Sequence, residues 1–217
     1  MDAKLRDYFK IYYRAMNEFA FNSKGFTDVI EEEPSKITID EFKETGLYKD
    51  VVNTSSRGLT SFKFNKKEYS IVDCAGHTKV NKRPALVFVG KLLRGKASYK
   101  GKENIIIYLK GSKQPLPPTN IDDVKKVLDD KAMCVYTNYK DWQKVVTKET
   151  LKKLNEIKTN ELLADAAISI HDSKQFVALG YDDPLMVPPL EHEYDEKPVK
   201  QLKNDLVKVL AVMEELA

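Results

Sequence analysis

The chain has 217 residues, of which 42% are hydrophobic and 32% charged, and its formal net charge is +3. This suffices for one sizeable packed domain, or one domain with a small appendage. We expect no membrane span, because no apolar run approaches the ~18 residues that one needs, and no signal peptide, because the first ten residues mix charges. Two cysteines, Cys74 and Cys134, are too few for a disulfide framework. A cytoplasmic location is therefore expected, in the host cytoplasm or the virion if the chain is viral.

The first half of the chain predicts one helix, a second short helix and then strands. Apolar residues at spacings of three and four predict an amphipathic helix over residues 2–21. Thr38 and Glu41 have the spacing of a capping box, which opens a short helix that Gly46 ends. From Leu59 the pattern alternates, and Asn65-Lys66-Lys67 separates the two strands of a hairpin. The elements expected after it are a basic loop over 77–83, a buried strand over 84–89, a basic loop over 94–102 and a strand over 103–110.

The proline-rich segment Pro115-Leu116-Pro117-Pro118 is a stiff connector and the best candidate for a boundary between subdomains. It separates residues 1–114, an N-terminal helix with a basic antiparallel β region, from residues 119–217, a helix-rich α/β region ending in an amphipathic helix. A single domain remains the alternative. The elements expected after the connector are a helix over 119–130, a strand over 132–136, one or two helices over 147–170, a strand over 175–179 and a last helix from Pro198.

These elements predict an α+β fold. Its centre is expected to be an antiparallel β-sheet, or a small barrel of the oligonucleotide-binding (OB) type, flanked by N- and C-terminal helices. The last helix carries apolar residues that alternate steps of three and four, as in a coiled-coil seam. This stripe fits oligomerisation as well as packing against the helix's own domain. Its residues are Val199, Leu202, Leu206, Val209, Met213 and Leu216.

Sequence motifs of catalysis are weak. No three glycines have the spacing of a nucleotide-binding loop, so we expect no cofactor. Cys74 and His77 have a ligand-like spacing but no second ligand pair, so no metal site is predicted. Asp73 and Glu103 lack the acid-x-Lys pattern of metal-dependent nucleases.

The residues Asp73-Cys74-Ala75-Gly76 resemble the Asp-Cys-Ser-Gly nucleophile turn of cell-wall peptidases of the NlpC type. That resemblance covers four residues and implies a cysteine nucleophile, with His171 as its base. In the family the cysteine opens a helix that lowers the thiol pKa. Residues 77–84 are not helical in pattern and the serine is absent. We therefore predict a protein that is not an enzyme.

The strongest functional signal is the uneven distribution of charge. Residues 57–113 contain fourteen Lys or Arg against three acids, a net +11, which leaves −8 for the rest of the chain. Basic residues that alternate with aromatic residues are typical of single-stranded nucleic-acid binding, where cations meet phosphates and rings stack on bases. The predicted contacts are Lys63, Lys66, Lys67, Lys79, Lys82, Arg83, Arg94, Lys96, Lys100 and Lys102, with Tyr99 as the exposed stacking ring.

Our leading hypothesis is a non-enzymatic protein that binds single-stranded DNA or RNA with low sequence specificity. It depends on the basic side chains gathering into one track on the folded protein. The alternative is a phage or viral structural protein that self-associates through its charged surfaces and last helix. In that case the partner is an acidic protein surface or another copy of the chain. A hydrolase built on Cys74, or on Asp73 and Glu103, is the third hypothesis.

Overall fold

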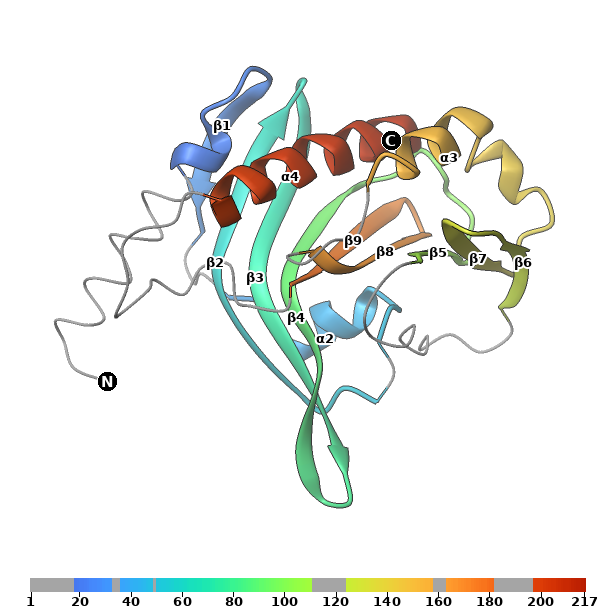
Figure 1. The fold of residues 1–217 in the computed structure, drawn as a ribbon, viewed down its shortest axis with the longest axis horizontal. Coiled ribbons are helices and arrows are strands. Elements are labelled where there is room, and N and C mark those ends of the chain that lie inside the picture. Colours follow the sequence, from blue (N-terminus) through green and yellow to red (C-terminus); the bar gives the residue numbers. More distant parts are fainter. Residues whose placement is uncertain (1–17, 33–35, 49, 111–123, 158–162, 182–196) are drawn as a thin grey trace, which may run out of the picture.

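The computed structural model describes residues 18–32, 36–48, 50–110, 124–157, 163–181 and 197–217. Within them, nine strands form one antiparallel sheet in the order β1-β2-β3-β4-β9-β8-β5-β7-β6 (Figure 1). The strands are β1 (Phe26–Glu31), β2 (Asn53–Phe64), β3 (Lys67–Val80), β4 (Arg83–Lys96), β5 (Ile105–Leu109), β6 (Lys125–Asp129), β7 (Met133–Thr137), β8 (Leu163–His171) and β9 (Lys174–Tyr181). The helical elements are α2 (Ile39–Glu44), the 3-10 helix η1 (Trp142–Lys144), α3 (Lys148–Leu154) and α4 (Lys197–Leu216).

The prediction of a central antiparallel sheet is confirmed, but the OB-like barrel is not. The sheet is open, and β1 and β6 form its two edges. The predicted N-terminal helix lies mostly outside the described residues, and only its end, residues 18–21, is seen as helix. Within the described residues, β5 from the first half of the chain pairs with β7 and β8 from the second half. The segment at residues 115–118 therefore does not separate two sheets.

Two-residue turns join the long strands into hairpins. Asn65 and Lys66 join β2 to β3 and both have positive φ, 48° and 71°, the pattern of a type I′ turn. Asn81 and Lys82, with φ of 50° and 65°, join β3 to β4 in the same way. The first hairpin confirms the sequence prediction. The second replaces the basic loop expected over residues 77–83, because the same turn chemistry lets the strands continue to Val80 and resume at Arg83.

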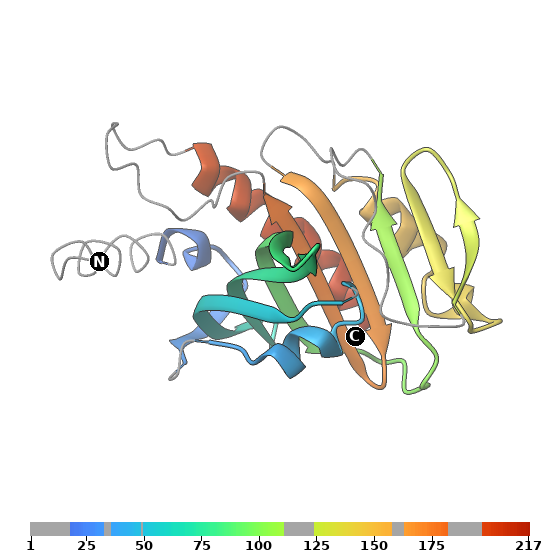
Figure 2. The same ribbon diagram turned by 90° about the horizontal axis from the view of Figure 1, so that it is seen from below.

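The capping box at α2 is present as predicted. The Glu41 backbone N–H donates to the Thr38 hydroxyl at 3.2 Å, and the Thr38 N–H donates to the Glu41 carboxylate at 2.7 Å. Gly46 follows the helix with φ of 67°, where a side chain would be strained. This short helix lies on one face of the sheet, and α4 lies on the other (Figure 2).

Both faces of the sheet are therefore covered by a hydrophobic core. On one face, α3 and α4 pack against residues such as Phe62, Leu93 and Ile168. On the other, α2 and the segment after it place Phe42 and Tyr48 against Phe88 and other core residues. A sheet that is buried on both sides has central strands without polar alternation, as in β5, all five residues of which are buried.

The second half of the chain has more strand than the sequence predicted. Residues 125–129 form β6 rather than part of a helix, and residues 163–171 form β8 rather than the end of one. The predicted last helix is present as α4, but its apolar stripe is buried within the same chain. Leu202, Leu206, Val209, Met213 and Leu216 are each at most 2% exposed. This corrects their assignment to oligomerisation; the side chain of Val199 lies outside the described residues.

Candidate functional site

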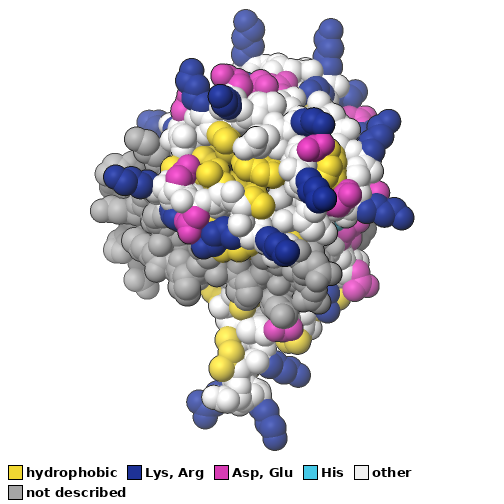
Figure 3. Space-filling model, turned by 90° about the vertical axis from the view of Figure 1, so that its right-hand side faces the viewer, with side chains coloured by type: hydrophobic (Ala, Val, Ile, Leu, Met, Phe, Trp, Pro, Cys, Tyr) yellow, Lys and Arg dark blue, Asp and Glu magenta, His cyan; other side chains and the backbone are white. Residues whose placement is uncertain are grey.

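The predicted nucleic-acid contacts do not form one track. Lys66 and Lys67 lie at the β2–β3 turn, where Lys67 Nζ donates to the Glu214 carbonyl of α4 at 3.0 Å. Lys100 and Lys102 are exposed in the β4–β5 loop. Basic and acidic side chains are interspersed over the face that Figure 3 shows.

Three of the predicted contacts are brought together on the α2 face of the sheet. Lys63, Arg94 and Lys96 line an open hollow of about 590 Å³. Each forms an ion pair with a carboxylate of the same chain: Lys63 with Asp28 at 2.7 Å, Arg94 with Glu41 at 2.9 Å and Lys96 with Glu68 at 3.5 Å. These ion pairs balance the local charge of the hollow and weaken its attraction for a polyanion.

Tyr99 is not the free stacking ring that the sequence predicted. Its ring centroid lies 5.1 Å from that of Tyr139, and its hydroxyl donates to the Glu103 carboxylate at 2.7 Å. Partial burial raises the pKa of Tyr99, and the hydrogen bond lowers the pKa of Glu103. The other rings of the basic segment, such as Phe62, Phe64 and Tyr69, belong to the core. Base stacking on this sheet is therefore not available from the described rings of that segment.

The remaining three predicted contacts lie on a projecting two-stranded arm. Pairing of β2 with β3 ends at His77, and pairing of β9 with β4 ends at Gly90. Residues 78–85 pair only with each other, and we call them the arm; Figure 1 shows it extending away from the sheet. Lys79, Lys82 and Arg83 are exposed on it, and none forms an ion pair with a described residue.

The arm also exposes apolar side chains near its tip and base. Val80 is 54% exposed, and Leu86, which pairs with His77 at the base, is also 54% exposed. The arm contains no acidic residue. In Figure 3 the projection at the foot of the molecule carries Lys or Arg together with hydrophobic side chains.

A second feature is a polar row across three strands on the α4 face. Arg57 of β2, Asp73 of β3 and Lys91 of β4 lie opposite one another in register, so their side chains leave the sheet on the same side. Arg57 Nε lies 3.2 Å from one Asp73 oxygen, and Lys91 Nζ lies 3.4 Å from the other. Lys91 is only 4% exposed, and its burial lowers the pKa of the ammonium while Asp73 opposes that shift.

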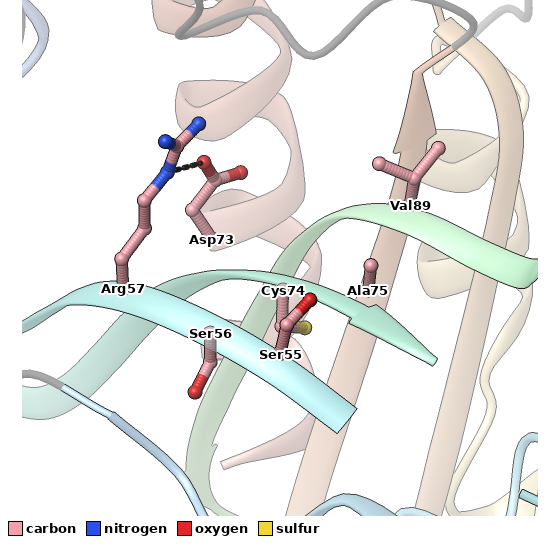
Figure 4. Close-up of a pocket in the computed structure, with 7 residues that line it drawn as sticks. All are labelled: Ser55, Ser56, Arg57, Asp73, Cys74, Ala75 and Val89. Carbon is pink, nitrogen blue, oxygen red and sulfur yellow. Dashed lines mark hydrogen bonds and ion pairs between the residues drawn. The ribbon is translucent and has the colours of Figure 1, made fainter. Parts of the chain in front are cut away.

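The polar row borders a hollow of about 230 Å³. Its lining includes Ser55, Arg57, Asp73, Ala75 and Val89. Figure 4 shows Arg57, Asp73, Ala75 and Val89 rising on one side of the strands, with Ser56 on the opposite side. Ser56 is already bonded to the backbone of Ile37. Arg57 and Asp73 of the polar row therefore line an open hollow.

The cysteine and metal hypotheses find no support in the geometry. Cys74 lies within strand β3 rather than at a helix start, and burial raises the pKa of its thiol far above the usual value. His171 Nε2 lies 3.0 Å from the Glu44 carbonyl, and its ring stacks on Phe176. Within the described ranges, no three His, Cys, Asp or Glu side chains converge as metal ligands. Cys74 therefore lacks the helix start and the lowered thiol pKa that the four-residue resemblance would imply for a nucleophile.

Comparison with known proteins gives a structural likeness but no match in sequence. No known family and no curated protein matches the sequence. A solved structure, the mycobacterial trehalose monomycolate transport factor A, aligns over 93% of this chain and 96% of that chain, with a TM-score of 0.48 and 11% identity. A likeness at this level carries no information on function. In the described parts of the chain, no helix is both long and apolar enough to cross a lipid bilayer.

Sequence reasoning missed both the arm and the polar row. Asn81-Lys82 repeats the Asn-Lys turn of residues 65–66, and this was the available signal for the arm. The polar row has no local signal, because Arg57, Asp73 and Lys91 meet only through the register of three strands.

Proposed function

We propose that the protein binds nucleic acid without catalysing a reaction, and that the arm is the main contact. The observation that supports this is a projecting antiparallel ribbon with three exposed basic side chains and no acidic ones. A two-stranded ribbon has the width to enter the major groove of duplex DNA, and Lys or Arg side chains on it would meet phosphates from either strand.

The proposed binding is electrostatic and has low sequence specificity. Because the rings of the basic segment are buried, base stacking contributes little to binding. The protein should therefore show little preference between single strands and duplexes. Three phosphate contacts would make the observed affinity fall with salt, with a log–log slope of about −2.7 on duplex DNA and about −2.1 on a single strand. Both slopes are shallow compared with proteins that use a full basic groove.

The test is fluorescence anisotropy of labelled single-stranded and duplex oligonucleotides between about 50 and 200 mM salt. One variant carries Lys79→Gln, Lys82→Gln and Arg83→Gln. The control carries Lys66→Gln, Lys100→Gln and Lys102→Gln, which removes the same charge from exposed positions away from the arm. We expect the arm variant to lose most of its binding and salt dependence, while the control keeps them.

Two results would reject the proposal. Absence of binding at low salt by the unmodified chain rejects nucleic acid as the ligand. Equal losses in the arm variant and the control assign the binding to overall charge and remove the arm from it.

A second function is favoured by the exposed apolar side chains on the arm and at its base. Val80 and Leu86 are typical of arms that dock on another protein, so assembly of a phage or viral structural protein remains the alternative. It predicts concentration-dependent assembly in light scattering that Leu86→Asn weakens. The stripe of α4 is not the contact in this alternative, since its described residues face the core.

A further inference from the structure

The arm is attached to the sheet through a short stretch of β4, residues 86–89, which we call the joint. The pairing of β4 with β9 begins only at Gly90. A Cβ at Gly90 would lie 1.9 Å from the Leu179 carbonyl oxygen, so the two backbones are in close contact there. Among the described strands, the joint pairs with β3 alone, and Val87 is an extra residue without a partner in it. Because such a bulge bends a strand, the joint is where the arm can move.

A small cavity separates the joint from the start of β8 and the end of β9. All four residues of the joint line it on one side, and Ala164, Asp165, Gly180 and Tyr181 line it on the other. Its volume of about 30 Å³ has room for one or two water molecules. This lining includes one carboxyl group, that of Asp165.

The Asp165 carboxyl has no counter-charge among the described residues. Its Oδ1 atom is buried and has no hydrogen-bond partner there. The titratable side chains around it are those of Tyr48, Tyr108 and Tyr181, and burial raises the pKa of all three, so none is charged near neutral pH. The joint itself contributes no titratable side chain. Desolvation therefore raises the pKa of Asp165 to about 6.

Loss of the proton changes the surroundings that this carboxyl requires. A carboxylate offers about four acceptor sites, and a cavity for one or two waters leaves most of them without a donor. Movement of the joint away from β8 and β9 would admit water and relieve this cost. The protonated form has less need of water, and the closed joint keeps Phe88 packed against Phe42 and Tyr48.

We propose that the joint is a pH-sensitive switch, which stays closed against β8 and β9 while Asp165 is protonated and opens more often, freeing the arm, once Asp165 is ionised. The opening depends on the joint and on Asp165, not on what the arm binds. Its use in controlling nucleic-acid binding rests on the function proposed above. Hydrogen exchange of the free protein tests the switch without nucleic acid, so the two proposals can fail separately.

The test is hydrogen–deuterium exchange of the full chain at about pH 5 and about pH 7.5, corrected for the intrinsic effect of pH on exchange. If the pKa of Asp165 changes from about 6 in the closed joint to its ordinary value in the open one, the opening constant rises about tenfold between these pH values. We expect the protection of residues 86–89 to fall by that factor. The turn at Asn65 and Lys66 has the same conformation as the turn of the arm and should keep its protection.

Two variants assign the effect to one side chain. Asp165→Asn removes the titrating group, so residues 86–89 should be equally protected at both pH values. His77→Gln is the matched control, because His77 pairs with Leu86 at the joint and histidine can change charge in the same range. This control should retain the tenfold change. Equal protection at both pH values in the unmodified chain, or a change that Asp165→Asn retains, would overturn the proposal.

Discussion

Asp165 lies on β8 beside Gly180 of β9, next to the point where β4 leaves β9 and continues into the arm. Its Oδ1 is buried and has no hydrogen-bond partner among the described residues. Desolvation raises the pKa of this carboxyl from its ordinary 3.8 to about 6, against a smaller opposing effect of the Ala166 backbone N–H. The carboxyl of Asp165 therefore holds its proton more tightly in the folded protein than in the unfolded chain.

This shift makes the stability of the protein fall as pH rises. Below about pH 4 the carboxyl is protonated in both the folded and the unfolded chain, and no penalty arises. Between about pH 4 and pH 6 the unfolded chain releases its proton first, so the folded state loses about 2–3 kcal/mol. Asp165→Asn removes this loss and should raise the free energy of unfolding by about 1–3 kcal/mol at neutral pH, with little effect near pH 3.5.

Urea unfolding at both pH values measures the difference. Asp172→Asn, at an exposed turn position where positive φ suits asparagine, is the control and should change little at either pH. A variant less stable than the original chain at neutral pH would show that the ionised Asp165 is stabilised by the fold.

Single residues also show what the sequence could and could not reveal. The capping residues Thr38 and Glu41 were predictable, because both partners lie within one turn of helix. The ion pair of Arg94 was not predictable, because its partner Glu41 is 53 residues away in the sequence. A basic residue in a sequence reports its charge but not the carboxylate that will meet it. This is why the count of cations suggested a track that the fold does not form.

At the scale of elements, α4 shows that one spacing of apolar residues is compatible with two kinds of packing. Steps of three and four predict an apolar stripe correctly, but they do not say whether the stripe meets another chain or its own sheet. In this fold Leu206 is 1% exposed against the sheet and α3, while Val207 beside it is 39% exposed. The helix therefore offers a matched pair of positions one residue apart.

Leu206→Ala should lower the free energy of unfolding by about 2–5 kcal/mol, because it leaves a cavity in the core. Val207→Ala should change it by less than about 0.5 kcal/mol, since the residue is partly exposed and alanine favours helix. Urea unfolding gives both values, and light scattering checks the oligomeric state. Dissociation of an oligomer by Leu206→Ala with unchanged stability would restore the stripe as an intermolecular seam.

Two strands, β6 and β8, were predicted as helix, and each error has an identifiable reason. Residues 163–171, Leu-Ala-Asp-Ala-Ala-Ile-Ser-Ile-His, are rich in alanine and almost continuously buried, and such a run has no period that separates strand from helix. Residues 125–129 form an edge strand that is mostly exposed, and pairing with β7 overrides their local preference. The hairpins were easier, because a turn such as Asn65-Lys66 is a local signal.

At the scale of the whole molecule, the charge asymmetry of the sequence is balanced in part by ion pairs between described residues. Acidic residues outside the basic segment return to it in space, as Asp28 does to Lys63 and Asp129 to Lys110. Paired surface charges of this kind contribute little to stability, but they reduce the field that a polyanion would meet. The basic side chains of the arm form no ion pair with a described residue, and there the prediction from the sequence retains a spatial basis.

The order of the strands also bears on how the chain folds. β4 pairs with β9, and β5 lies between β8 and β7, so residues before 114 and after 119 are interleaved in one sheet.

A chain cut at an engineered protease site between residues 114 and 119 should therefore stay associated in native buffer. Its two pieces share the backbone hydrogen bonds of three strand pairs and both hydrophobic cores. Size-exclusion chromatography should show one peak at the mass of the intact chain, which separates only in denaturant, and the uncut chain should unfold in one cooperative transition. Separation of the pieces without denaturant, with either one remaining folded, would show that the segment at residues 115–118 divides two independent domains after all.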